Sequence, residues 1–193
     1  MISVKTYCNA QTTALFLLNK FKVLENVKIG NFQNITEIFE EMERKGMKFG
    51  VSTKSLLENI HIVTKEINVD VVLLSLDDLG FNNKPEKEKN MINGVSYEDI
   101  YRRAERAGLS LCPDEISFQL RLQYSNQLIG EYIVVATKPI IDHVDQWPKL
   151  FILGRNDSGL WLNCDSYSKL DDSWSGRCLY AFVSSPNFSI DSP

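Results

Sequence analysis

Acidic side chains suited to ligand binding gather in two segments of the C-terminal half, residues 139–148 and 165–176. Together the segments hold five aspartates, one histidine and two tryptophans, namely Asp142, His143, Asp145, Trp147, Asp165, Asp171, Asp172 and Trp174. Carboxylates with a histidine can bind a hard cation through oxygen, and tryptophan rings beside carboxylates can hold a sugar or a cationic ligand. The other interpretation is an ordinary solvated loop. No EF-hand spacing is present, so we assign no metal.

The strands around these segments predict that they meet in space. From Ser117 onward, apolar residues alternate with polar ones, which is typical of a half-buried strand. Four more strands are predicted over residues 131–137, 149–154, 160–163 and 178–183, with a tight turn at 156–159. Because alternate connections of an antiparallel meander lie at one end of the sheet, 139–148 and 165–176 should emerge together.

A second candidate site begins at Cys112, in the segment Cys112–Glu115 (CPDE). A cysteine at a helix N-terminus has a stabilised thiolate, and His143 with Asp142 or Asp145 would complete a nucleophilic set. The other interpretation is a buried thiol followed by acids that stabilise a helix dipole. The adjacent acids oppose thiolate formation, which favours this second interpretation.

Arg121 is the last candidate for binding a ligand. It falls on the strand predicted from Ser117 and lies nearly opposite Glu131 across the turn at 125–129. A cross-strand ion pair is therefore expected. The functional interpretation is that the forked guanidinium of Arg121 binds an anionic ligand.

The first half of the chain has mainly helical patterns. Helices are predicted over residues 9–22, 34–45, 52–60 and 96–107, and a strand over 69–74. Asn34 with Glu37, and Ser96 with Asp99, have the spacing of capping boxes. Residues 82–94 have no apolar face and are predicted to be a charged linker, and the Ser/Pro-rich end from 184 to 193 is predicted to be loose.

These elements predict an α+β protein with a helical N-terminal half packed on a five-stranded, mainly antiparallel meander sheet or half-barrel. The predicted organisation is a mostly helical region over 1–81, the linker over 82–94, and an α+β region over 95–193. The alternative organisation is a single compact domain.

Charge and cysteine usage restrict the class of partner. Residues 1–95 carry 12 basic and 12 acidic residues, whereas 96–193 carry 9 and 13, which accounts for the net charge of −4. No basic run exceeds two residues, so we expect no nucleic-acid partner. The sequence has no signal-peptide pattern and no apolar stretch long enough to span a membrane. The four cysteines (Cys8, Cys112, Cys164 and Cys178) form no C-x-x-C pair, so we expect reduced thiols in a cytoplasmic protein.

Five short segments together form a recognisable pattern. They are Leu79–Phe81 (LGF), Tyr97–Ala104 (YEDIYRRA), Gly108–Glu115 (GLSLCPDE), Leu120–Tyr124 (LRLQY) and Gly159–Leu162 (GLWL). In these segments the chain resembles a group of small uncharacterised bacterial proteins with no known activity. The resemblance implies a bacterial, cytosolic origin and a continuous α+β unit, and it supplies no catalytic residue. This chain has Gln127-Leu128 where the group has Gln-Pro, so its turn there is expected to differ.

The leading functional hypothesis is a non-enzymatic binding or protein-interaction module that needs no cofactor. It follows from the lack of a catalytic motif and from strands that are apolar on both faces. The expected partner is another protein or a second copy of this chain that covers one face of the sheet. The alternative is a small hydrolase or metal-dependent enzyme that uses the acidic connections.

Overall fold

The computed structural model describes residues 4–5, 21–81, 95–166 and 178–184, and for residues 4, 5, 25, 165 and 166 it describes the backbone alone. Most of the helix predicted over 9–22, the linker at 82–94 and the end of the chain from 185 lie outside the described residues. Among the described helices, none combines the length and apolar character that crossing a membrane requires.

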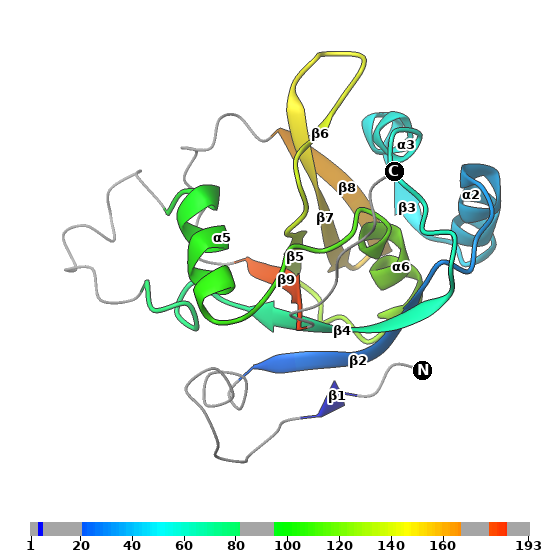
Figure 1. Cartoon of the computed structure of the whole chain (residues 1–193). Helices are drawn as coiled ribbons and strands as arrows, with labels where there is room; N and C mark the ends of the chain where they lie inside the picture. Colours follow the sequence, from blue (N-terminus) through cyan, green and yellow to red (C-terminus); the bar gives the residue numbers. More distant parts are fainter. Residues whose placement is uncertain (1–3, 6–20, 82–94, 167–177, 185–193) are drawn as a thin grey trace.

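The described strands form one mixed sheet (Figure 1). They are β1 (Val4–Lys5), β2 (Lys22–Ile29), β3 (Lys48–Phe49), β4 (Ile67–Leu74), β5 (Tyr132–Val135), β6 (Ile140–Ile141), β7 (Pro148–Asn156), β8 (Gly159–Ser166) and β9 (Leu179–Val183). The order is β1-β2-β4-β9-β5-β7-β8-β3, and β6 pairs with the start of β7. The pairs β5–β9 and β3–β8 are parallel, and the other pairs are antiparallel.

The predicted architecture is wrong in two respects. The sheet is mixed and nine-stranded in the described part of the chain, rather than a five-stranded antiparallel meander. The helices also do not form an N-terminal half, since they are α2 (Ile35–Arg44), α3 (Val51–Leu57), α5 (Tyr97–Arg106) and α6 (Ile116–Gln123). Because β9 pairs with β4 on one side and with β5 on the other, strands from both halves of the chain join in one sheet.

The strand predicted from Ser117 is in fact the helix α6. Seven of its eight residues, Ile116 to Leu122, are buried, so this helix lies inside the core and needs no amphipathic stripe. Its polar residues alternate with apolar ones because they have buried partners on different sides. Gln119 bonds Glu115, whereas Arg121 bonds Gln127. The alternation that suggested a strand therefore reflects internal polar contacts.

The local signals for helix ends and turns are confirmed. Asn34 caps α2 by accepting a hydrogen bond from the Glu37 N–H at 3.1 Å, and Ser96 caps α5 by accepting one from the Asp99 N–H at 3.1 Å. The turn between β7 and β8 ends at Gly159, with a positive φ of 114° that favours glycine.

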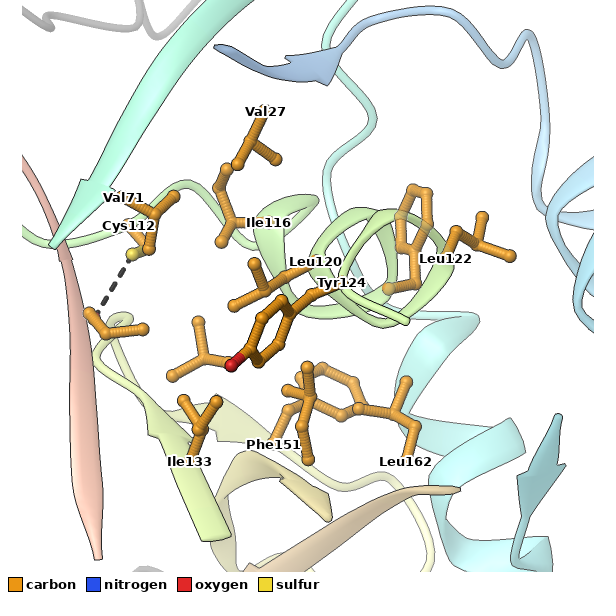
Figure 2. Close-up of a cluster of buried hydrophobic side chains, with 14 of the residues drawn as sticks. Val27, Val71, Cys112, Ile116, Leu120, Leu122, Tyr124, Ile133, Phe151 and Leu162 are labelled. Atoms are coloured by element: carbon orange, nitrogen blue, oxygen red, sulfur yellow. Dashed lines mark hydrogen bonds between the residues drawn. The ribbon is translucent and has the colours of Figure 1, made fainter. Parts of the chain in front are cut away.

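Each face of the sheet carries its own hydrophobic core. Helix α6 packs on one face, where the cluster of Figure 2 includes Leu120, Ile133 and Phe151. Helix α5 covers part of the other face, where Tyr97 contacts Tyr180 with ring centroids 6.4 Å apart. Successive residues of β5 and β7 point into the two cores alternately, which explains why these strands are apolar almost continuously.

Candidate functional site

The hairpin formed by β6 and β7 projects from the sheet and carries four residues of the predicted acidic site, Asp142, His143, Asp145 and Trp147 (Figure 1). Three large apolar side chains of this hairpin face solvent: Val144 is 80% exposed, Trp147 51% and Ile141 47%. We call Ile141, Val144 and Trp147 the hairpin tip. Exposed apolar side chains grouped on one projecting element are typical of interaction sites.

Lys149 forms ion pairs with both aspartates in the loop of this hairpin. Its Nζ lies 2.5 Å from Oδ2 of Asp142 and 2.6 Å from Oδ2 of Asp145. The other carboxylate oxygens accept backbone N–H groups, Asp142 from Val144 at 2.9 Å and Asp145 from Trp147 at 3.0 Å. Both carboxylates therefore hold the hairpin in shape, and a cation would have to displace the ammonium group of Lys149.

These contacts set the protonation of the three groups. The hydrogen bond from Lys149 and the backbone N–H of Val144 hold the pKa of Asp142 below its ordinary value. The same lysine and the N–H of Trp147 lower the pKa of Asp145. Burial alone would lower the pKa of Lys149, but its bonds to the two carboxylates outweigh burial and the net pKa is raised.

Replacing Lys149 by methionine is expected to raise the pKa of the Asp142 carboxyl. The variant keeps the volume of the side chain but removes the ammonium group that stabilises the ionised carboxylate. In the wild type the ion pair stabilises the fold above the ordinary pKa of an aspartate, about 3.9, and the stabilisation is lost as the pH falls through the lowered value. Carboxyl carbon chemical shifts followed against pH would measure the change.

The control for this titration is Glu41, a carboxylate on α2 whose pKa is lowered by its hydrogen bond from Arg44 rather than by Lys149. Its titration should be the same in both proteins. An unchanged Asp142 titration in the variant would contradict the role given to Lys149.

The remaining predicted site residues are placed only in part. His143 is exposed, and its carbonyl accepts a hydrogen bond from Gln146 Nε2 at 2.9 Å. The backbone of Asp165 pairs with Leu150, and Ser166 pairs with Lys149, so the end of β8 lies at the same end of the sheet as the hairpin. Three predicted residues lie outside the described part of the chain: Asp171, Asp172 and Trp174. Where side chains are described, no three His, Cys, Asp or Glu residues are arranged to hold a metal.

Cys112 lies in the core rather than at an accessible site. Its side chain is buried, and its Sγ donates to the carbonyl of Ala181 at 3.2 Å. Burial raises the pKa of the thiol, which opposes the thiolate that a nucleophile requires. The geometry supports the interpretation of Cys112 as a structural thiol.

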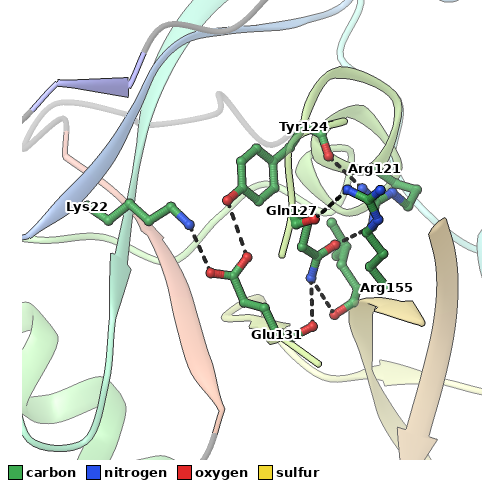
Figure 3. Close-up of polar contacts among 7 residues, drawn as sticks. Lys22, Arg121, Tyr124, Gln127, Glu131 and Arg155 are labelled. Carbon is green, nitrogen blue, oxygen red and sulfur yellow. Dashed lines mark hydrogen bonds and ion pairs between the residues drawn. The ribbon is translucent and has the colours of Figure 1, made fainter. Parts of the chain in front are cut away.

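Arg121 is fully buried at the end of α6 and bonds neutral acceptors (Figure 3). Its guanidinium donates to Gln127 Oε1 at 2.5 Å, to the carbonyl of Tyr124 at 2.6 Å and to the carbonyl of Gly154 at 3.2 Å. The expected ion pair with Glu131 is wrong, because Arg121 lies on a helix and Glu131 instead bonds Lys22 Nζ at 2.8 Å. With no opening to solvent, Arg121 cannot bind a ligand directly.

Arg121 instead fixes the turn that joins α6 to β5. Gln127, which accepts from Arg121, donates to the carbonyls of Glu131 at 2.9 Å and Leu153 at 3.3 Å. Arg155 closes the turn from outside, since its Nη1 donates to the carbonyl of Gln127 at 2.9 Å. We call Arg121, Gln127 and Arg155 the turn network.

The turn network supports an exposed apolar surface that the sequence analysis did not single out. Leu128 is 68% exposed and Ile129 is 63% exposed. Tyr132 is also exposed, and the centroid of its ring lies 5.9 Å from the ring centroid of Trp161. We call Leu128, Ile129 and Tyr132 the turn surface. The available signal was two adjacent aliphatic residues inside a turn, where small or polar residues are usual.

A pocket of about 410 Å³ lies beside α5, between that helix and residues 109–111. Its lining carboxylate Glu98 bonds Arg102 at 2.6 Å, and the Tyr101 hydroxyl donates to the carbonyl of Thr137 at 3.1 Å. The lining includes neither histidine nor cysteine, so it offers no Cys–His nucleophile.

Comparison with protein-family models, with curated proteins and with solved structures returns no match to this chain. The resemblance to small bacterial proteins therefore stays a prediction.

Proposed function

We propose that this chain is a non-enzymatic protein-interaction module that binds a partner protein through the hairpin tip. The observation that carries the proposal is the contrast within this hairpin. Its two aspartates are bound internally by Lys149, whereas Val144 and Trp147 are directed to solvent. The hairpin thus presents apolar side chains on a backbone that its own ion pairs hold.

The energetics favour a partner with an apolar groove. Burying a Val, Leu, Ile or Phe side chain is worth about 1.5–3 kcal/mol, and tryptophan is enriched among residues that dominate binding energy. A hairpin that is already ordered loses little conformational entropy on binding. Trp147 and Val144 are therefore the expected anchors, and Ile141 extends the contact along β6.

Site-specific photocrosslinking in cells that carry the native gene would test this proposal. A benzophenone amino acid at position 144 is expected to give one discrete crosslinked species, because this side chain would lie in the groove of the partner. Replacement of Trp147 by alanine in the same protein should remove that species. The free energy of unfolding should stay within about 0.5 kcal/mol of the parent protein, as is usual for substitutions at exposed positions.

Val51 provides the matched control, since it is 89% exposed but stands alone at the start of α3. The same photoreactive group at position 51 should not give the species obtained at position 144. Equal crosslinking from both positions, or no discrete species from position 144, would contradict the proposal.

A further inference from the structure

The turn surface lies at the opposite end of β7 from the hairpin tip. Residues 128–132 adjoin Gly154 and Arg155 near the end of β7, since Tyr132 pairs with Gly154 and the Gly130 N–H donates to the carbonyl of Arg155 at 2.9 Å. The hairpin tip instead adjoins Pro148 at the start of the same strand. The turn surface is therefore a separate feature, independent of the proposed function of the hairpin.

The backbone beneath the turn surface is held by hydrogen bonds from several directions. Gln127 bonds Arg121, Arg155 and the carbonyl of Leu153, and the Glu131 N–H donates to the carbonyl of Leu128 at 3.1 Å. Two aliphatic side chains are thus presented to solvent by a turn with fixed geometry. Fixed geometry lowers the entropic cost of binding, which makes this turn a suitable recognition element.

The turn network also carries positive charge without a matching carboxylate. No ion pair joins Arg121 or Arg155 to an acidic residue among the described side chains, and Arg121 Nε is buried without a hydrogen-bond partner. The nearby carboxylate of Glu131 bonds Lys22 and the Tyr124 hydroxyl. Asp157, at the tip of the β7–β8 hairpin, makes no ion pair with either arginine.

The unpaired positive charge of the turn network favours a partner that brings a carboxylate. A buried cation without a counter-ion costs several kcal/mol, and a carboxylate brought close to it from outside would reduce that cost. Arg155 is partly exposed, so its guanidinium can contact such a carboxylate directly. An apolar surface beside unneutralised arginines complements a segment that combines aliphatic and acidic side chains.

We propose that the turn surface is a second binding site, whose ligand is a peptide segment with aliphatic side chains next to an aspartate or glutamate. Leu128 and Ile129 contact the aliphatic side chains, and Arg155 pairs with the carboxylate. Arg121 positions the turn from beneath, and its positive charge attracts the ligand carboxylate without direct contact.

Selection of short random peptides displayed on phage against the full chain would test the inference. Peptides that bind the turn surface are expected to be enriched in Asp or Glu beside Leu, Ile or Phe. Binding of the best synthetic peptide, measured by fluorescence anisotropy, should fall at least tenfold for the double variant L128S/I129S. Because Leu128 and Ile129 are exposed, the double variant should unfold at the same urea midpoint as the wild type.

A double-mutant cycle isolates the charged contact. Replacing the peptide carboxylate by its amide should weaken binding to the wild type about tenfold, and should have little effect on binding to the Arg155→Gln variant. Because Arg155 also holds the turn, the cycle compares peptides on the same protein and so cancels any loosening of the turn. Arg106→Gln, at an exposed arginine on α5, should retain the full effect of the amide substitution.

The outcomes of these experiments distinguish an acidic peptide ligand, a purely apolar ligand and the absence of a binding site. If peptides lose affinity with L128S/I129S but the carboxylate contributes equally with and without Arg155, the acidic partner is wrong and an apolar one is indicated. If no selected peptide depends on Leu128 and Ile129, the second binding site itself is overturned. Neither outcome bears on the hairpin tip, which photocrosslinking at position 144 tests separately.

Discussion

Replacement of Glu115 by glutamine is expected to lower the free energy of unfolding by about 2–4 kcal/mol. The carboxylate of Glu115 is fully buried at the start of α6. One oxygen accepts from the Gly30 N–H at 2.6 Å and from Gln119 Nε2 at 2.8 Å, and the other accepts from the Val63 N–H at 2.7 Å. A glutamine amide would place an NH₂ group against one of these donors, leaving a buried N–H unsatisfied.

Urea unfolding of the two proteins would measure this loss. Glu105→Gln is the matched control, because Glu105 is exposed on α5 and makes no ion pair with a described residue. The control should change stability by less than about 0.5 kcal/mol. An equally small change for Glu115→Gln would show that the three donors find other acceptors, and would contradict the role given to this carboxylate.

Glu115 shows why sequence patterns predicted helix ends better than the core. An acid next to a helix start was predicted to stabilise the helix dipole, but its side chain makes no capping bond and reaches two distant segments. Those partners lie 85 and 52 residues earlier in the chain, so no local spacing indicates them. The caps at Asn34 and Ser96 were predictable because donor and acceptor are three residues apart.

The strand order was beyond prediction for the same physical reason. Neighbouring strands were expected to follow one another in sequence, as most do. Here β9 pairs with β4, placing Phe182 opposite Val72, and with β5 in parallel. These pairings bury the apolar strands on both faces, but a pattern of apolar residues does not specify which strands meet.

For the candidate site, the sequence predicted the acidic residues but not their counter-ion. Asp142 and Asp145 were expected to form a solvated rim or a ligand site, and their end of the sheet was placed correctly next to the end of β8. Nothing local marks Lys149 as their partner, because it directly precedes a run of apolar strand residues. Its spacing of four and seven residues from the two aspartates becomes meaningful only in the antiparallel hairpin of β6 and β7.

Among substitutions in the turn network, Arg121→Lys is expected to lower the free energy of unfolding the most. Because no carboxylate pairs with Arg121, its positive charge is a cost that its three hydrogen bonds offset. Lysine would retain the charge but lose the fork that reaches Gln127 and two backbone carbonyls. We expect a loss of about 3–4 kcal/mol, greater than the loss of about 2–3 kcal/mol for Arg121→Met, which leaves acceptors unpaired but removes the charge.

The pH dependence separates the charge from the hydrogen bonds. Burial lowers the pKa of Arg121 to about 10, so the wild-type guanidinium stays charged between about pH 7 and pH 9. A buried lysine there would have its pKa lowered below the value in the unfolded chain, so the unfolded state would bind more protons and stability would rise with pH. Urea unfolding should show this rise for Arg121→Lys relative to both the wild type and Arg121→Met. Equal pH dependence in all three proteins, or a lysine variant as stable as the methionine variant, would show that the charge at this position carries no net cost.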